Sequence, residues 1–396
     1  MLLTRTAIEP ILPEQYLRSL DDLACSVLEQ AARLDQKVRP ELRKDLAELT
    51  RWMHCYYSNL IEGQQTRVRD IEAALQQNFA AEPEKRSLQQ LALAHLAVQK
   101  WAATYSGSPY QGSFFCELHR LFYSQLPAEM RVATTSSGQK SPLQPGELRT
   151  GDVEVGTHVA PPCELVPGLL EHFSLRYESG ELSRTRKVIA VAASHHRFAW
   201  IHPFRDGNGR VARLFSDTLI RQLGIDGGGL WSLSRGLAVQ RSEYYALLSN
   251  ADQERSARSA DDGRGHLSER ALRDFCTFVL RVMLDQIAFM DSLLELNSLA
   301  ARIEHYTKVE AGFGQEADGA FLLLREALYR GEFARGEAGR IIGAAERKGR
   351  MVLAKVIEAG LLKSDTPKSK VRLALPAKAL ATYFPQLFPI DQFGKG

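Results

Sequence analysis

The stretch HPFRDGNGRVAR, residues 202–213, decides the fold because it marks a turn between two helices. Apolar residues dominate 188–200 before it and recur at helical spacing over 211–223 after it, so both flanks are predicted helices. Gly207 and Gly209 lie between them, and glycine lets a backbone take a positive φ or approach a ligand closely. The stretch is therefore predicted to be a helix–loop–helix junction whose second helix begins at the glycines.

The same residues predict an anion site at the start of the second helix. The N–H groups of a helix N-terminus and its dipole both attract a phosphate group. Arg210 and Arg213 are three residues apart, so both guanidinium groups can reach one side of that phosphate. Asp206 would be repelled by a phosphate unless a hard cation such as Mg2+ bridges them. His202 is then the group that can take up a proton near neutral pH.

Each of these features also has an ordinary structural explanation. A Gly-Asn-Gly sequence is a common turn, and two arginines on a helix usually face solvent. His195 and His196 are neighbours on a helix and point about 100° apart, so they are predicted core histidines rather than a metal pair. Phe204 is expected to pack inward and anchor the loop. The functional interpretation depends on the joint occurrence of His202, Asp206, Gly207, Asn208, Gly209, Arg210 and Arg213.

The stretch resembles the signature of the Fic (filamentation induced by cAMP) family, H-x-F-x-[D/E]-G-N-G-R-x-x-R, at every specified position. The resemblance implies a mainly α fold, in which a Fic-type helical bundle carries a small β-hairpin flap. It also implies protein AMPylation, the transfer of AMP from ATP to a hydroxyl side chain of a target protein. In that reaction His202 deprotonates the hydroxyl and Asp206 holds Mg2+ on the α- and β-phosphates. The resemblance assigns the phosphates to Gly207, Asn208 and Gly209 as a cradle, and to Arg210 and Arg213 on the β- and γ-phosphates.

A second motif lies upstream, where residues 58–63 have the sequence SNLIEG. It resembles the inhibitory motif [S/T]-x-x-x-E-[G/N] of regulated Fic proteins, and its upstream place resembles their second class. Ser58 and Glu62 are i, i+4 neighbours on a helix. The resemblance implies that Glu62 pairs with Arg213, so that the guanidinium needed by the ATP γ-phosphate is occupied and ATP binds in a skewed position. The alternative is an ordinary exposed glutamate.

Residues 149–162, RTGDVEVGTHVAPP, alternate around Val153, Glu154 and Val155, which predicts a short hairpin. The hairpin resembles the Fic flap, which covers the nucleotide and docks an extended target segment by strand addition. The alternative is an exposed hairpin without a ligand. The nucleotide-side candidates are Val155, Gly156, Thr157 and His158.

Residues 242–252, SEYYALLSNAD, predict a helix that follows the motif. The resemblance implies that Tyr244, Tyr245 and Asp252 border the adenine pocket. Relatives can have asparagine in place of Asp252. Tyrosines packed in the core are the alternative interpretation.

The composition is that of an ordinary globular protein. The chain has 396 residues, 44% hydrophobic and 24% charged, enough for two or three domains. Its five cysteines are scattered without a C-x-x-C pair, so neither a zinc site nor a disulfide framework is indicated, and a cytoplasmic location is expected. The N-terminal stretch MLLTRTAIEPILPEQ lacks the long apolar core of a signal peptide, and no apolar run approaches the roughly 18 residues that span a bilayer, so neither secretion nor membrane contact is expected. A net charge of +3 is too small to predict nucleic-acid binding by itself.

Three regions are predicted along the chain. Residues 1–105 form an N-terminal helical region that carries the inhibitory motif and is interrupted near Pro40 and Pro83. Residues 106–302 form the Fic catalytic core, and residues 303–396 form a separate unit. Within the core we expect a helix at 114–123, a loop at 127–145, a polar excursion at 253–268 and long helices over 269–302.

The last region predicts three helices, at 318–329, 335–343 and 347–359, and two strands within 361–375. This pattern resembles a winged helix. Residues 340–375 hold nine Lys or Arg against three Asp or Glu, so their net charge is +6. The third helix could enter a DNA major groove, and a solvated face on a docking module is the alternative.

Three functions from different classes follow. The favoured one is an autoinhibited protein adenylyltransferase; the second is the same site in reverse, with Glu62 orienting a water that removes AMP from a target. The third is a DNA-binding regulator whose Fic site senses a nucleotide, and the intact His202 argues against it as the sole role. Arg210 and Arg213 favour a triphosphate donor. The sequence leaves open whether the target is another protein or the chain itself, and whether the chain forms a homodimer.

Overall fold

The computed structural model describes residues 4–15, 17–134, 140–156, 158–178, 182–256 and 262–389. The first helices are α1 (Leu17–Lys37), α2 (Pro40–Ile61), α3 (Val68–Leu75), α4 (Pro83–Thr104), α5 (Gly112–Ser124), α6 (Val166–Tyr177), α7 (Arg184–Ile201) and α8 (Asn208–Gln222). They are followed by α9 (Leu233–Val239), α10 (Arg241–Asn250), α11 (Glu269–Leu293), α12 (Leu296–His305), α13 (Ala317–Arg330), α14 (Ala338–Ile341), α15 (Glu346–Glu358) and α16 (Ala377–Tyr383).

The strands are short and all their pairings are antiparallel. Strand β1 (Val132–Thr134) pairs with β2 (Lys140–Pro142), and β3 (Glu154–Val155) pairs with β4 (His158–Val159). A small C-terminal sheet has the order β5-β7-β6, from β5 (Glu332–Phe333), β7 (Val371–Leu373) and β6 (Leu362–Lys363). Short helical turns complete the elements: η1 (Ala128–Met130), η2 (Cys163–Leu165), η4 (Tyr306–Glu310), η5 (Gly314–Glu316) and η6 (Arg335–Glu337).

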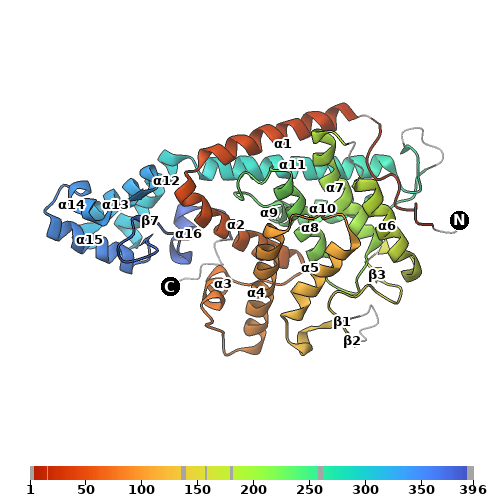
Figure 1. The fold of residues 1–396 in the computed structure, drawn as a ribbon, viewed down its shortest axis with the longest axis horizontal. Helices are drawn as coiled ribbons and strands as arrows, with labels where there is room; N and C mark the ends of the chain where they lie inside the picture. The colour runs from red at the N-terminus through yellow and green to blue at the C-terminus, as the bar shows by residue number, and fades with distance from the viewer. Residues whose placement is uncertain are drawn as a thin grey trace.

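Helix α7 lies at the centre of the larger helical body, with the long helices α1 and α11 packed against it (Figure 1). Its residues from 188 to 198 are all buried, as expected for a helix surrounded by others. Phe198 belongs to an aromatic cluster with Phe115 of α5, Phe173 of α6 and Phe215 of α8; the rings of Phe115 and Phe198 lie 4.6 Å apart. This cluster fixes the two helices that flank residues 202–207.

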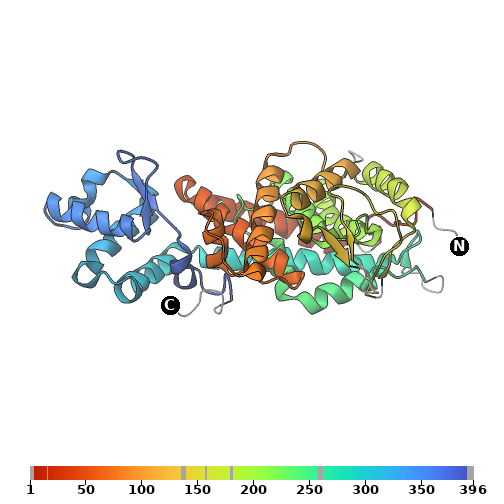
Figure 2. The same cartoon turned by 90° about the horizontal axis from the view of Figure 1, so that it is seen from below.

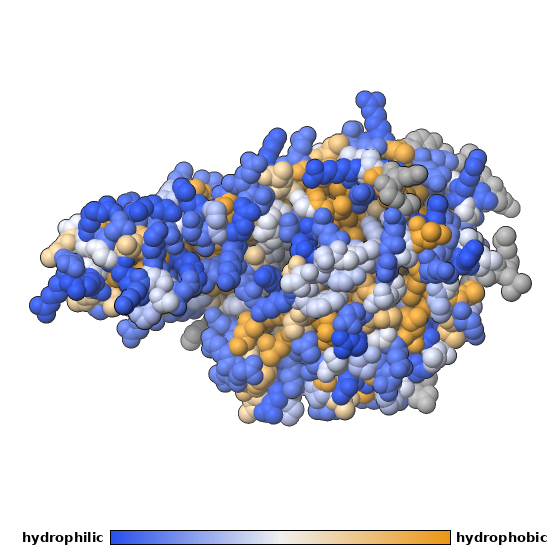
Figure 3. Space-filling model, in the orientation of Figure 1, coloured by the Kyte–Doolittle hydropathy of each residue, from blue (hydrophilic) through white to orange (hydrophobic). Residues whose placement is uncertain are grey.

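Helices α13, α14 and α15 and the small sheet form a unit at one end of the molecule (Figure 2). The predicted helices and the predicted strand pair are confirmed there. The face of this unit seen in Figure 3 is mostly hydrophilic, whereas apolar patches lie over the larger body. The sequence did not predict strand β5, because a two-residue strand leaves no alternating pattern.

Most of the positive charge between 340 and 375 is countered by acids, several of them from outside that segment. Lys363 and Arg372 pair with Asp45 of α2, Lys355 with Glu316 and Lys370 with Glu332. The local net charge of the sequence therefore overstates the charge that a nucleic acid would meet, and DNA binding stays a prediction. No helix in the described part of the chain is both long and apolar enough to cross a membrane.

The helices predicted around the motif are confirmed, as are the interruptions at Pro40 and Pro83, which stand in the first turns of α2 and α4. One prediction is wrong. The expected loop at 127–145 contains the turn η1 and the β1–β2 hairpin, whose three-residue strands are too short to show a period among the surrounding Ser, Gly and Pro. The helices predicted over 269–302 are present as α11 and α12, which are separated where the Glu295 side chain caps α12. Helices α6 and α9 were not anticipated, and the domain boundaries stay predictions.

The aromatic cluster gives a test of where the core lies. Phe215→Ala is expected to lower the free energy of unfolding by about 3 to 5 kcal/mol, because it removes a fully buried ring from a close-packed site. Leu175→Ala, at a side chain that is 70% exposed, should change it by less than about 0.5 kcal/mol. Denaturant titration of the two variants measures both values. Equal effects would show that the Phe215 cluster is not a packed core.

Candidate active site

His202 stands directly after α7 in an unusual backbone conformation. Its φ of 49° and ψ of 60° are left-handed, a region that residues other than glycine seldom occupy. The His202 N–H donates to Phe198 O (3.1 Å), and the His202 carbonyl accepts from Arg149 Nε (2.8 Å). Such strain costs on the order of 1 kcal/mol and persists only where neighbouring contacts impose it. The end of α7 and the buried Arg149 therefore fix the position of the backbone from which the His202 imidazole extends.

The loop after His202 is closed by Asn208. Its Nδ2 donates to Phe204 O (2.7 Å), and its Oδ1 accepts from Phe204 N (2.9 Å). Phe204 is fully buried, as predicted, and its ring stacks on His119 with centroids 4.1 Å apart. Since the Asn208 amide is engaged with the loop, the groups left to face an anion are the N–H groups at the start of α8.

Glycine is required at position 207 for two reasons. Its φ is 82°, and an added Cβ would lie 2.7 Å from a carbon of the Tyr123 ring. The close approach of the loop to α5 therefore depends on the absence of a side chain at Gly207.

Asp206 is held by two side chains of α5. The Tyr123 hydroxyl donates to Asp206 Oδ2 (2.9 Å), and His119 Nε2 lies 3.3 Å from the Asp206 carbonyl oxygen. Gly146 N donates to His119 Nδ1 (2.8 Å), so the proton of the neutral ring is on Nε2 and points at that carbonyl. Burial lowers the pKa of His119 to about 4, which keeps the ring neutral. The only sequence signal for this pair is its i, i+4 spacing on one face of α5.

Arg210 borders a cavity of about 370 Å³, which is also lined by Asp206, Tyr123 and Gln64. Its Nη2 donates to Gln64 Oε1 (2.7 Å), and its guanidinium lies over the Phe122 ring. No carboxylate of the described residues forms an ion pair with it. A buried cation beside a cavity and without a carboxylate partner is well placed to receive a phosphate group.

The predicted contact between Glu62 and Arg213 is present. Arg213 Nη2 donates to Glu62 Oε1 (2.6 Å) and to Ser58 O (3.0 Å), and its Nε donates to Ser58 Oγ (2.9 Å). The Arg213 side chain is 2% exposed and that of Glu62 is 28% exposed. Burial alone would raise the pKa of Glu62, but Arg213 and Arg210 outweigh it and lower that pKa, so the carboxylate is charged.

The Glu62 carboxylate also lies against Gly209, in the predicted phosphate cradle. A Cβ at Gly209 would collide with Glu62 Oε1, so a side chain there would push the end of the Glu62 side chain aside. Arg213 and the start of α8 are therefore reached by the same carboxylate.

The predicted hairpin is confirmed as β3 and β4, with Gly156 in its turn at a φ of 62°. Val155 is 49% exposed and Val159 is 70% exposed, so the hairpin presents apolar side chains to solvent. Thr157 lies outside the described residues. Arg149 joins the hairpin to the loop, because it donates to the carbonyls of Pro161 and His202.

His158 points from β4 toward Asp252 rather than into solvent. Its Nδ1 lies 3.2 Å from Asp252 Oδ2, and the other oxygen of Asp252 lies 3.1 Å from His196 Nε2. Burial would raise the pKa of Asp252, but hydrogen bonds from His158 and His196 lower it to about 2. The structure thus gives Asp252 a contact with the flap, while its predicted role at adenine stays untested.

The two tyrosines of α10 differ in their surroundings. Tyr244 is buried, with its hydroxyl 2.9 Å from His195 Nε2, as the alternative of a core tyrosine predicts. Tyr245 is 41% exposed and donates to Ile61 O (3.3 Å). Tyr245 therefore touches the helix end that carries Glu62.

The electrostatic setting of His202 suits a proton acceptor. Burial, followed by the neighbouring His158, lowers the pKa of His202 to about 4. The rings of His158 and His202 have centroids 6.3 Å apart. His202 is therefore neutral at neutral pH and has a lone pair available.

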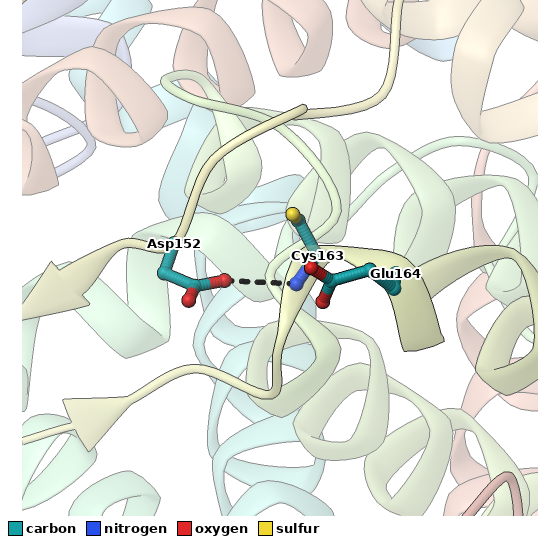
Figure 4. A group of neighbouring side chains, drawn as sticks. All are labelled: Asp152, Cys163 and Glu164. Atoms are coloured by element: carbon teal, nitrogen blue, oxygen red, sulfur yellow. Dashed lines mark hydrogen bonds between the residues drawn. The ribbon is translucent and has the colours of Figure 1, made fainter.

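One cluster of metal-ligand type occurs in the described part of the chain, and it lies beside the hairpin. The ligand atoms of Asp152, Cys163 and Glu164 are within 4.8 Å of one another (Figure 4). Asp152 Oδ1 already accepts from Cys163 N (2.9 Å), so its place is explained by capping the turn η2. Asp206 belongs to no such cluster. A single carboxylate is nevertheless sufficient for Mg2+, which takes its other ligands from phosphates and water.

Comparison with known proteins agrees with this geometry. Residues 112–220 match the model of the Fic/DOC family. The chain as a whole has a mainly helical Fic fold with small hairpins. A Fic family protein from Desulfovibrio desulfuricans has a TM-score of 0.55 at 19% identity and covers 92% of this chain and 98% of its own. Fic-1 from C. elegans has a TM-score of 0.54 at 18% identity, over 71% of this chain and 74% of its own. These two likenesses concern the fold alone.

The chain is also distantly related to proteins named protein adenylyltransferase Fic. That of Drosophila erecta is 33% identical over 116 residues, 29% of this chain and 22% of the relative. That of Drosophila mojavensis is 26% identical over 252 residues, 63% of this chain and 45% of the relative. The match thus spans less than half the length of either relative.

The contact between Tyr123 and Asp206 can be tested by removing one oxygen atom. Tyr123→Phe is expected to raise the Mg2+ concentration needed for half-maximal ATP binding by about tenfold, because partners that orient a metal ligand have effects of that size. Calorimetric titration at varied Mg2+ measures the shift. Tyr105→Phe is the matched control, since the Tyr105 hydroxyl contacts Ser108 O instead. An unchanged Mg2+ requirement in Tyr123→Phe would contradict the positioning role.

Proposed function

We propose that the protein is an adenylyltransferase of the second, upstream-inhibited class of Fic proteins. It transfers AMP from ATP to a hydroxyl group of a target protein. The observation that carries the proposal is the arrangement of one neutral base, His202, one exposed carboxylate, Asp206, and two buried arginines around the start of α8. Base, carboxylate and phosphate ligands are the groups that in-line attack on a phosphorus atom requires.

In the proposed reaction the target oxygen forms a bond to the α-phosphorus while the bond from that phosphorus to the bridging oxygen breaks. The hydroxyl proton passes to His202, and pyrophosphate leaves. Arg210, beside the cavity, and Arg213 hold the departing phosphates. Asp206, oriented by Tyr123, would hold Mg2+, which spreads the charge of the phosphates. Triphosphate specificity follows from having two guanidinium groups beyond the cradle.

The proposed restraint is the Glu62–Arg213 pair. A γ-phosphate that bound Arg213 would have to displace Glu62, whose carboxylate already neutralises the buried guanidinium at 2.6 Å. The pair is supported by Ser58, whose hydroxyl and carbonyl oxygens both accept from Arg213. ATP can then enter the site only in a displaced position, which lowers the transfer rate.

The exposed edge of the flap supports a protein as the acceptor. Val155 and Val159 are apolar and solvent-exposed on a two-stranded hairpin that has no further strand beside it among the described residues. An extended segment of a target could add to that edge as a strand and place its hydroxyl near His202. Whether the segment comes from another protein or from a second copy of this chain is a question for the experiment below.

The Glu62–Arg213 pair, which we call the latch, predicts a gain of activity on mutation. Glu62→Gly is expected to incorporate at least about tenfold more AMP than the unmodified protein, since it leaves Arg213 to the γ-phosphate. Intact-protein mass spectrometry after incubation with Mg-ATP measures the added AMP. Glu358→Gly, at the exposed end of α15, is the control for a glutamate lost from a helix terminus. Equal incorporation in Glu62→Gly and the unmodified protein would refute the latch.

The same samples test the base and the reverse reaction. Glu62→Gly combined with His202→Ala should incorporate no AMP, and persistent labelling would exclude His202 as the base. The reverse reaction is favoured by one observation, the position of the Glu62 carboxylate against Gly209 in the cradle. If the unmodified protein removes AMP from a labelled target faster than Glu62→Gly does, hydrolysis is the activity of the latched state.

The lowered pKa of His202 predicts the pH dependence of transfer. A base with a pKa of about 4 stays unprotonated from pH 8 down to pH 6, so the rate of Glu62→Gly should be flat over this range. A histidine with an ordinary pKa near 6.5 would be about three quarters protonated at pH 6 and the rate would fall accordingly. Initial rates at constant ionic strength and saturating Mg-ATP distinguish the two. A fall with a midpoint near pH 6.5 would contradict the lowered pKa.

A further inference from the structure

The C-terminal residues of the described chain return to helix α2, which carries Ser58 and ends next to Glu62. Phe384, Leu387 and Phe388 are buried. The Tyr57 hydroxyl donates to Leu387 O (3.0 Å), and the Phe388 ring is stacked on Tyr57 with centroids 6.4 Å apart. We call residues 384–388 the tail clasp. It contacts α2 at the residue immediately before Ser58.

Arg235 of α9 also holds the tail clasp. Its Nη2 donates to Gln386 O (3.0 Å), and its guanidinium lies 3.6 Å from the centroid of the Phe289 ring. The same guanidinium lies 5.9 Å from the Tyr57 ring. Backbone carbonyls of two successive clasp residues, Gln386 and Leu387, are therefore held by side chains of the larger body.

The C-terminal unit also touches α2 at Asp45, twelve residues before Tyr57. Asp45 accepts from Lys363 of β6, and Arg372 of β7 lies 3.7 Å from the same carboxylate. The N-terminal half of α2 is thus tied to the small sheet, and its C-terminal half is tied to the clasp. Four residues of α2 follow Tyr57 before the helix ends at Ile61.

We propose that the tail clasp restrains the last turns of α2 and so keeps Glu62 on Arg213; this rests on the proposed autoinhibition. A helix terminus opens locally at low free energy unless tertiary contacts hold it. Tyr57 and Ile61 are i, i+4 neighbours on one face, so a contact at Tyr57 limits rotation and fraying of the turn that presents Ser58 and Glu62. Displacing the C-terminal unit would then release the latch without any ligand touching the active site.

The test compares clasp variants with and without the latch. Phe388→Ala should raise AMP incorporation about fivefold or more, and Tyr57→Phe should raise it less, since coupling free energies between sites are of this size. In the Glu62→Gly background neither variant should add any increase. Tyr383→Phe and Phe321→Ala are the matched controls, because both residues are buried in the C-terminal region without a place in the clasp. Equal stimulation in both backgrounds would overturn the proposal.

A second measurement does not depend on catalysis. Hydrogen exchange followed by mass spectrometry should show faster exchange at residues 59–62 in Phe388→Ala and unchanged exchange there in Phe321→Ala. If Glu62→Gly transfers no AMP, the proposed function fails, while faster exchange still supports the clasp. If exchange at residues 59–62 and transfer are both unchanged in a folded Phe388→Ala, the clasp does not restrain α2.

Discussion

The buried guanidinium of Arg213 is the constraint on which the rest of the site depends. A cation taken out of water needs an anion or a set of oxygen acceptors close by, because an unpaired buried charge is very costly. In this structure Glu62 and both oxygens of Ser58 supply them. The proposed alternative partner is the terminal phosphate of the nucleotide. In this proposal Glu62 and the terminal phosphate compete to neutralise the same buried guanidinium, and that competition is what restrains activity.

The groups around that charge are held rigidly before any substrate binds. Asn208 closes the loop on Phe204, and Arg149 ties the loop to the base of the hairpin. Tyr123 orients the Asp206 carboxylate from α5. Catalytic dipoles and charges act most strongly where they need no reorganisation during the reaction. Holding these groups in place lowers the free energy of unfolding, for instance through the strained left-handed backbone of His202.

Much of the site could be predicted from the sequence because its residues lie within one loop and one helical turn, where spacing determines geometry. The long-range pair of Glu62 and Arg213 could be predicted too, but only because a second motif resembles one that accompanies the first. Tyr123 and the tail clasp had no such signal. Their partners lie 83 and 330 residues away in the sequence, and nothing in local periodicity records which distant oxygen a tyrosine will reach. Short hairpins such as β1–β2 were missed for the related reason that three residues show no period.

Asp252 shows how one carboxylate can connect elements that lie far apart in the sequence. His196 Nδ1 accepts from Arg197, so its proton is on Nε2 and points to one oxygen of Asp252. The other oxygen faces His158 Nδ1, and His158 Nε2 faces the carbonyl of Trp200. The two oxygens of the Asp252 carboxylate thus lie between a histidine of α7 and a histidine of the hairpin. Asp252 and His158 together connect the flap to α7, the helix that ends at the proposed base His202.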